Sequence, residues 1–426
     1  MRCLNPKLIL VGALVLLGST GCSNLKEGSS SEPFMHHKIG IAALKAGENE
    51  KAAKNFKFAI DEYTQEHGEN HEGVAISYNN LGTATNRKGD YANAVVYFKK
   101  ALAIDIKRLG KEHKTIAIYY NNLGSAYARQ KKFKEALVYL NKALVINLKH
   151  LGSKHVYVSS LYRNIAYIYF QQKSYKKAIA NLEISLDIDR AHYGEKHEIV
   201  GKKYHDLGLA WHKRKKYDKA LGYYNKALPI QISSLGTHLD VAQTYGNIGS
   251  IYFRKRQFSK AVDFYKKSLE VETKARGVGH IKLVRRHNSI ALSYRRLNDY
   301  DRAAVYYERA LAIEIKKYGN EHRIVAARYS LLGTTYHYKK DFSRAIVYYE
   351  KSLAIDQKNK TKRKSRNLAL QYSNMGKAYR GKGNNTLALA NFRRALNLRL
   401  RDLGKDHPKT KKTIKRISLL EKKPAK

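Results

Sequence analysis

The most constraining feature of this sequence is a short motif, Gly-x-x-His, that recurs at a step of 42 residues. Its glycines are Gly68, Gly110, Gly152, Gly194, Gly277, Gly319 and Gly404, and a form one residue shorter occurs at Gly236 and His238. Alanines keep the same step at Ala94, Ala136, Ala178, Ala220, Ala261, Ala303, Ala345 and Ala388. A fixed period of this length is typical of a stacked array in which each unit buries the face of its neighbour.

Each repeat is predicted to form two helices. Apolar side chains recur at helical spacing in residues 115–131 and again in residues 133–151, with a short basic turn between them. Gly152 follows the second segment and is expected to end that helix in a left-handed conformation. Because Gly124 and Ala136 are small, we expect the two helices to approach each other closely at these positions.

These motifs resemble the tetratricopeptide repeat. The Asn-Leu-Gly-x-x-Tyr of residues 122–127 is similar to its first helix, and the Ala-x-x-Tyr-x-x-x-Ala-Leu of residues 136–144 is similar to its second. The usual period is about 34 residues, and the 42-residue form with a Leu-Gly-x-x-His link resembles the kinesin-light-chain variety. The resemblance covers residues 37–407 and implies an all-α, right-handed superhelical solenoid of about nine stacked helix-turn-helix units. Residues 408–426 are expected to form a C-terminal cap helix and a basic tail.

The start of the chain predicts an export signal. Two cations precede an apolar run over residues 8–17, and small residues then lead to Cys22. This order is typical of a secretory signal peptide, and its end at a cysteine resembles a bacterial lipoprotein signal. The resemblance implies removal of residues 1–21, a lipid on Cys22 and, because Ser23 follows, the outer membrane; ordinary cleavage or a retained anchor are the alternatives. Residues 22–36 are expected to form a flexible tether.

In tetratricopeptide proteins the ligand usually lies along the concave face lined by each first helix, so the resemblance implies a binding groove. The residue before Leu-Gly is expected to face it, and an asparagine amide there can donate to and accept from a peptide backbone. A cation two helical turns further on is expected on the same face. The predicted groove residues are Asn80, Asn122, Asn164, Asp206, Asn247 and Asn374, with Arg87, Arg129, Lys213, Arg254 and Arg296. In the alternative interpretation each asparagine bonds within its own repeat and each cation is a solvated edge.

The recurring histidines do not predict a metal site. Equivalent residues of neighbouring repeats lie at least about 8–10 Å apart, whereas zinc needs nitrogens within about 2.1 Å of one ion. We therefore expect the histidines to anchor the turns between repeats. Residues 358–366 replace one Gly-x-x-His link with a basic run, which is either a patch for phosphate or acidic lipid or a solvated loop.

The charge balance bounds the function. Lys and Arg number 82 against 35 Asp and Glu, a formal net charge of +47. Such a field attracts anionic partners, although basic surfaces along the whole chain also fit a lysine-rich genome. Gly-x-Ser-x-Gly, the phosphate-binding Gly-x-x-x-x-Gly-Lys loop and His-Glu-x-x-His do not occur, so neither an enzyme nor a cofactor is expected.

Together these features predict a non-enzymatic scaffold, tethered by lipid in the cell envelope, that binds acidic or extended protein partners in its groove. One alternative is a binder of anionic polymers, namely nucleic acid, acidic glycan or lipid phosphate. Nucleic acid is less favoured because regularly placed exposed aromatics are not evident. The other alternative is a structural spacer.

Overall fold

The computed structural model describes residues 32–421, except residue 237 and residues 359–363. The predicted signal peptide, Cys22, residues 22–31 of the predicted tether and the basic tail after residue 421 lie outside the described residues. Within the described part the chain forms nineteen α-helices and one short 3-10 helix, without strands. The prediction of an all-α fold of stacked helix-turn-helix units is confirmed. The contacts divide the chain into a first unit, residues 1–230, and a second unit, residues 231–426.

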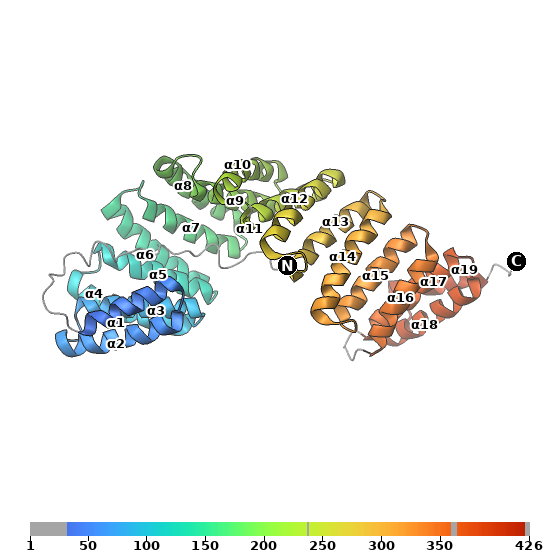
Figure 1. Ribbon diagram of the computed structural model, residues 1–426, viewed down its shortest axis with the longest axis horizontal. Coiled ribbons are helices and arrows are strands. Elements are labelled where there is room, and N and C mark those ends of the chain that lie inside the picture. Colours follow the sequence, from blue (N-terminus) through green and yellow to red (C-terminus); the bar gives the residue numbers. More distant parts are fainter. Residues whose placement is uncertain (1–31, 237, 359–363, 422–426) are drawn as a thin grey trace. The chain divides into compact units, whose positions relative to one another are not determined.

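In the first unit consecutive helices pack in pairs as helix-turn-helix hairpins, and each hairpin packs on the next (Figure 1). The helices are α1 (Glu32–Ala46), α2 (Asn49–His67), α3 (Glu72–Lys88), α4 (Tyr91–Leu109), α5 (Lys114–Arg129), α6 (Phe133–Leu151), α7 (Val156–Gln171), α8 (Tyr175–Tyr193), α9 (Glu198–Lys213) and α10 (Tyr217–Leu235). Helix α1 begins before the predicted start of the array, so residues 32–36, which we assigned to the tether, are helical. The unit boundary follows Pro229, which lies inside α10.

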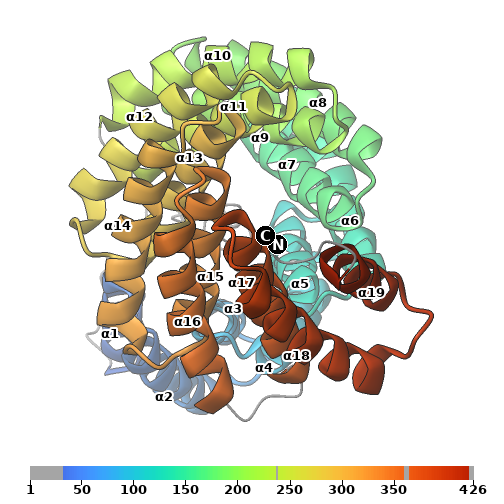
Figure 2. The ribbon, with the colours of Figure 1, turned by 90° about the vertical axis from the view of Figure 1, so that its right-hand side faces the viewer.

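The second unit continues the same pattern. Its elements are α11 (Leu239–Arg254), α12 (Phe258–Arg276), the 3-10 helix η2 (Ile281–Leu283), α13 (Val284–Arg296), α14 (Tyr300–Tyr318), α15 (Arg323–Tyr338), α16 (Phe342–Lys358), α17 (Lys364–Gly381), α18 (Asn385–Leu403) and α19 (Pro408–Glu421). Helices α13 to α18 follow one another in sequence order in both ribbon views (Figures 1 and 2). Helix α19 packs on α18, with Ile417 in one cluster with Phe392, so the predicted cap helix is confirmed.

Close contact within several hairpins depends on the glycine of Leu-Gly. A Cβ atom on Gly124 would lie 2.6 Å from Cγ of Leu140 and 3.2 Å from the backbone oxygen of Ala136. A Cβ on Gly82 would lie 2.7 Å from a ring carbon of Phe98. Because real Cβ atoms do not approach so closely, the α3–α4 and α5–α6 pairs need glycine here for their observed packing, as we predicted for Gly124, whereas α7 and α13 carry buried alanines, Ala166 and Ala291, at this position.

The link between hairpins combines a glycine with a capping histidine. Gly110 has φ 82° and ψ 162°, a region essentially restricted to glycine; Gly152, at φ 78° and ψ 168°, lies there too rather than in the left-handed helical region that we expected. His113 then caps the next helix, with Nδ1 accepting a hydrogen bond from the backbone N–H of Thr115 at 3.3 Å. The same bond recurs at His71, His155, His197, His238, His280, His322 and His407. The predicted anchoring role of the histidines is confirmed.

The turn within a hairpin is short, three residues between α5 and α6 and two between α3 and α4, and one residue of it has positive φ. Between α5 and α6, the N–H of Lys131 donates to Ala128 O at 3.0 Å and the N–H of Lys132 donates to Tyr127 O at 2.9 Å, the paired bonds of a Schellman motif. Lys131 has φ 64°. At the equivalent turn between α3 and α4 this position is Gly89.

Candidate functional site

The predicted groove asparagines of the first unit connect neighbouring hairpins. Nδ2 of Asn122 on α5 donates to Oδ1 of Asn79 on α3 at 2.8 Å, and Nδ2 of Asn164 on α7 donates to Oδ1 of Asn121 on α5 at 3.0 Å. These bonds cross from one repeat to the next, which neither of our interpretations anticipated. Asn122 is half-buried and Asn164 is buried.

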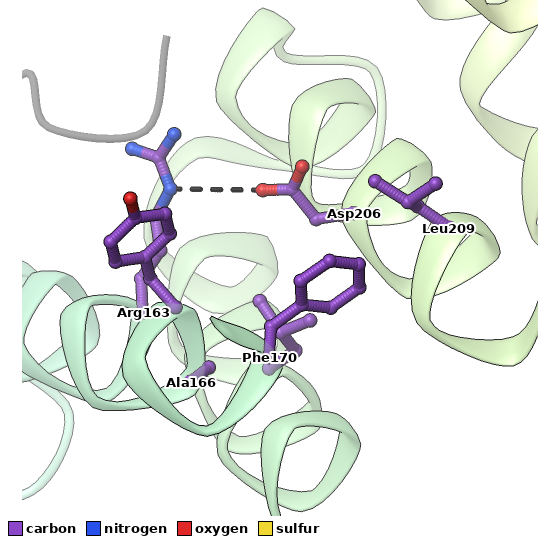
Figure 3. Close-up of a pocket in the computed structure, with 7 residues that line it drawn as sticks. Arg163, Ala166, Phe170, Asp206 and Leu209 are labelled. Carbon is purple, nitrogen blue, oxygen red and sulfur yellow. Dashed lines mark ion pairs between the residues drawn. The ribbon is translucent and has the colours of Figure 1, made fainter. Parts of the chain in front are cut away.

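The next contact along this row of side chains, from α7 to α9, is an ion pair. Nε of Arg163 on α7 lies 3.8 Å from Oδ2 of Asp206 on α9, and both side chains are about one-fifth exposed. Beneath the pair is a hollow of about 320 Å³, including the solvent at its mouth, where Phe170 and Leu209 approach from the two helices (Figure 3). Its lining residues are Arg163, Ala166, Tyr167, Phe170, Leu182, Asp206 and Leu209.

Arg129 belongs to the surroundings of this hollow. Burial raises the pKa of the Tyr167 hydroxyl, and the positive charge of Arg129 opposes that rise. Arg129 is half-buried at the end of α5, while Lys213 is exposed at the end of α9. The hollow therefore combines apolar walls with one cation, Arg163, and one carboxylate, Asp206, among its lining residues.

Two predicted groove residues near the N-terminus, Arg87 and Asn80, add little to the candidate binding surface. Nη1 of Arg87 donates to the backbone oxygen of Leu44 at the end of α1 at 2.7 Å, and burial lowers the pKa of the guanidinium. Arg87 therefore stabilises the stacking of two hairpins, which neither the groove interpretation nor the solvated-edge alternative anticipated. Asn80 is half-buried on α3.

In the second unit the predicted residues do not form a continuous row. Nδ2 of Asn247 on α11 is buried without a hydrogen-bond partner among the described residues. Oδ1 of Asn374 on α17 accepts from Nζ of Lys377 at 2.9 Å. Arg254 and Arg296 end α11 and α13 and are exposed.

The intervening hairpins explain this break. Ser289 occupies the asparagine position on α13, and its hydroxyl donates to the backbone oxygen of Arg285 at 3.1 Å. Leu331 occupies it on α15 and is 37% exposed. Neither side chain offers an amide, so the candidate site is the row on α3, α5, α7 and α9.

Several charged residues that the sequence did not single out are buried at the junctions between hairpins. Nζ of Lys203 lies 3.2 Å from Oδ2 of Asp189, and burial lowers the lysine pKa to about 8. In the second unit Arg328 donates to both carboxylate oxygens of Glu314, at 2.8 and 3.0 Å. In each pair the two residues are fourteen positions apart in the sequence, and this shared spacing of opposite charges is the signal that could have revealed the pairs. They are packing residues and are withdrawn from any surface.

Sequence comparison decides the family. Tetratricopeptide-repeat models match residues 32–107, 82–149, 157–233, 201–274 and 283–358, and a second such model matches residues 368–409. This chain belongs to the tetratricopeptide repeat family. Proteins with this fold are typically interaction scaffolds, and no enzymatic family is indicated.

Solved structures agree at the level of the fold. The apo form of RapI is 16% identical with a TM-score of 0.57, over 88% of this chain and 99% of that one. The C-terminal part of a tetratricopeptide protein from Cytophaga hutchinsonii is 17% identical with a TM-score of 0.50, over 68% of this chain and 98% of that one. A putative kinesin light chain from Podosopora anserina is 19% identical, with a TM-score of 0.43, over 49% of this chain and 99% of that one. No curated protein matches.

Two further searches bear on the chemistry. No three or more His, Cys, Asp or Glu side chains are grouped to hold a metal ion within residues 32–421, the undescribed positions aside. Within the same residues no helix is both long and apolar enough to cross a membrane. The row and the hollow of the first unit therefore combine amide hydrogen-bonding groups, apolar walls and positive charge, features typical of sites that bind peptides.

Proposed function

We propose that this protein is a non-enzymatic scaffold that captures an extended protein segment along α3, α5, α7 and α9. The observation that supports it is the row of amides of Asn122 and Asn164 continuing into the hollow below Arg163. A groove with backbone-directed amides suits an extended peptide, since each peptide unit offers both a donor and an acceptor.

The chemistry of the site also favours a particular partner. Arg163 lines the hollow beside Asp206, the charge of Arg129 acts on Tyr167 in its wall, and Lys213 is exposed at the end of α9, so an acidic segment is favoured over a basic one. Phe170 and Leu209 in the wall of the hollow offer an apolar contact for one side chain of that segment. The proposed ligand is therefore an extended acidic stretch that carries an apolar anchor.

Capture from an extract of the protein's own envelope tests this proposal. The groove variant is Arg129→Glu with Lys213→Glu, and the control variant is Lys111→Glu with Lys154→Glu, which makes the same charge change at exposed positions in the links between hairpins. Arg87 is left unchanged because it stabilises the stacking. The groove variant should lose the partner at unchanged helicity while the control keeps it; equal retention by both variants contradicts the groove.

The salt dependence of binding distinguishes this proposal from its main alternative, a binder of anionic polymers. Capture of one segment should saturate at fixed stoichiometry and weaken moderately with salt, whereas binding of an anionic polymer through many phosphates should weaken steeply. A protein that retains nothing under any condition would be a spacer.

We further propose that the scaffold is held in the cell envelope by a lipid on Cys22, with the outer membrane as destination. The supporting features are those of the sequence, the apolar run over residues 8–17 and the cysteine that follows. Labelling cells with a radioactive fatty acid should mark the wild-type chain and not Cys22→Ala, and the variant should leave the membrane fraction. Equal labelling of both chains would refute the anchor.

A further inference from the structure

The turns of three successive hairpins in the first unit gather uncompensated positive charge. We name this surface the turn edge, and it consists of Lys131, Lys132, Lys134, Lys173, Lys176, Lys177, Lys215, Lys216 and Lys219. All nine lysines are exposed, and no ion pair joins any of them to another described residue. The same short segments contain only two acidic residues, Glu135 and Asp218.

The turns lie side by side because the hairpins stack. Nε2 of Gln130, next to the α5–α6 turn, donates to the backbone oxygen of Tyr91 at the start of α4 at 2.9 Å, so neighbouring turns touch. Helices α5 and α7 are also in contact. The nine lysines therefore follow one edge of the stack.

The opposite edge of the same hairpins has a different charge pattern. There the links carry Glu112, which accepts from Lys149 at 2.5 Å, and Glu195, which accepts from Arg190 at 2.6 Å. On the link side these two carboxylates neutralise Lys149 and Arg190, while Lys111, Lys154 and Lys196 there are exposed. On the turn side none of the nine lysines is neutralised by an ion pair to another described residue.

The local structure shows that these lysines are unfavourable for the fold. Lys131, Lys173 and Lys215 have φ between 60° and 64°, a conformation that disfavours side chains other than glycine and asparagine. Lys132 at the start of α6 makes no side-chain cap bond, and α8 has no acidic residue in its first turn. The α3–α4 turn solves the same geometry with Gly89 and the capping Asp90, so the lysines are not required by the turn itself.

We propose that the turn edge docks on an anionic lipid bilayer. Lysine is a flexible point charge that suits diffuse attraction to headgroups, whereas arginine favours bidentate phosphate recognition. Lysines predominate in these turns, and the arginine among them, Arg214, lies over the ring of Trp211 at 4.9 Å. The nearby aromatic faces are covered by cations, Lys177 over Tyr169 at 5.4 Å and Lys219 over Trp211 at 4.6 Å, so they do not form a stacking platform for bases. The inference rests on the proposed membrane anchor, which would keep the first unit close to a bilayer.

Lysine acetylation mapped by mass spectrometry tests the surface on the full chain. The protein is mixed with vesicles of phosphatidylglycerol or of neutral phosphatidylcholine and treated with an acetylating reagent. Lys132, Lys176 and Lys216 should react at least about fivefold more slowly on the anionic vesicles, while Lys111, Lys154 and Lys196 of the link edge change by less than about twofold. Salt at about 1 M, where the Debye length is about 3 Å, should remove the difference.

A charge-matched pair of variants makes the test specific. The turn variant is Lys131→Gly, Lys173→Gly and Lys215→Gly, three positions where glycine fits the backbone. The link variant is Lys111→Gln, Lys154→Gln and Lys196→Gln, with the same net charge. At roughly fivefold for each lysine, the turn variant should need on the order of 100-fold more anionic vesicles for half-maximal protection, and the link variant should behave like the wild type.

Three results would overturn the proposal. They are equal protection on both vesicle types, equal loss of protection in both variants, and protection by duplex DNA at matched phosphate concentration without protection by vesicles. The last result would identify a nucleic-acid surface instead. Because vesicle binding is read here without envelope extract, a failure of this docking leaves the groove experiment unaffected, and a loss of the Cys22 anchor leaves the protection pattern measurable.

Discussion

Replacing Lys131 by glycine and Lys132 by aspartate is expected to stabilise the α5–α6 hairpin by about 2 kcal/mol. The structure supplies both parts of the estimate. Lys131 has φ 64°, and relief of a left-handed non-glycine residue is worth about 1 kcal/mol after the entropic cost of glycine is subtracted. A capping aspartate contributes about 1 kcal/mol more.

The geometry for the cap already exists. Lys132 has φ −82° and ψ 72°, close to the φ −86° and ψ 75° of Asp90, whose carboxylate accepts from the backbone N–H of Asn93 at 3.2 Å. An aspartate at position 132 should therefore reach the N–H of Glu135. It would also replace a cation at a helix N-terminus with an anion, which the helix dipole favours.

Urea unfolding followed by circular dichroism at 222 nm measures the change, with both single variants included because neighbouring substitutions need not add. The reciprocal variant, Gly89→Lys with Asp90→Lys, should destabilise the α3–α4 hairpin by a similar amount. If Lys131→Gly lowers the unfolding midpoint, or if the double variant leaves it unchanged, the assignment of these turns as locally unfavourable is wrong.

Three further outcomes are expected. Gly124→Ala should cost about 1–3 kcal/mol in the same urea titration, because the added methyl group would overlap the facing helix. Burial lowers the pKa of His37 from 6.5 to about 4. As the pH falls below 6.5 the unfolded chain binds a proton at this histidine before the folded chain does, so about 3 kcal/mol of the free energy of unfolding is lost by the time the pH reaches about 4. The variant His37→Gln should therefore lose correspondingly less stability between pH 7.5 and pH 4. Arg328→Met should cost about 3–5 kcal/mol by leaving the buried carboxylate of Glu314 unpaired, and adding Glu314→Leu should recover most of that loss.

Periodicity predicted the elements well because each repeat position has the same surroundings. The two helices predicted over residues 115–131 and 133–151 appear as α5 and α6, and Gly124 and the histidines fulfil their predicted packing and capping roles. These are properties of one repeat and its immediate link, so a pattern along the chain is sufficient to find them.

Partner choice across repeats was not predictable in the same way. Asn122 bonds to Asn79 rather than within its own repeat, because that choice depends on the offset between stacked hairpins, which no spacing in the sequence reports. Arg87 was assigned to the groove from its distance along the helix, yet it reaches back to the carbonyl of Leu44. The ligand remains a prediction, since the groove positions are known and the segment that would occupy them is not.

The charged residues behind the net charge of +47 therefore do not all have the same role. Lysines and arginines at the junctions, such as Lys203, are paired with buried carboxylates and are shielded from salt. Those at the groove are few and share their surroundings with Asp206. The excess that solvent ions can reach includes the turn edge, so added salt should release the protein from an anionic bilayer while the stacking of its hairpins is retained. A protein that lost helicity and lipid docking over the same range of salt would show that one set of charges serves both purposes.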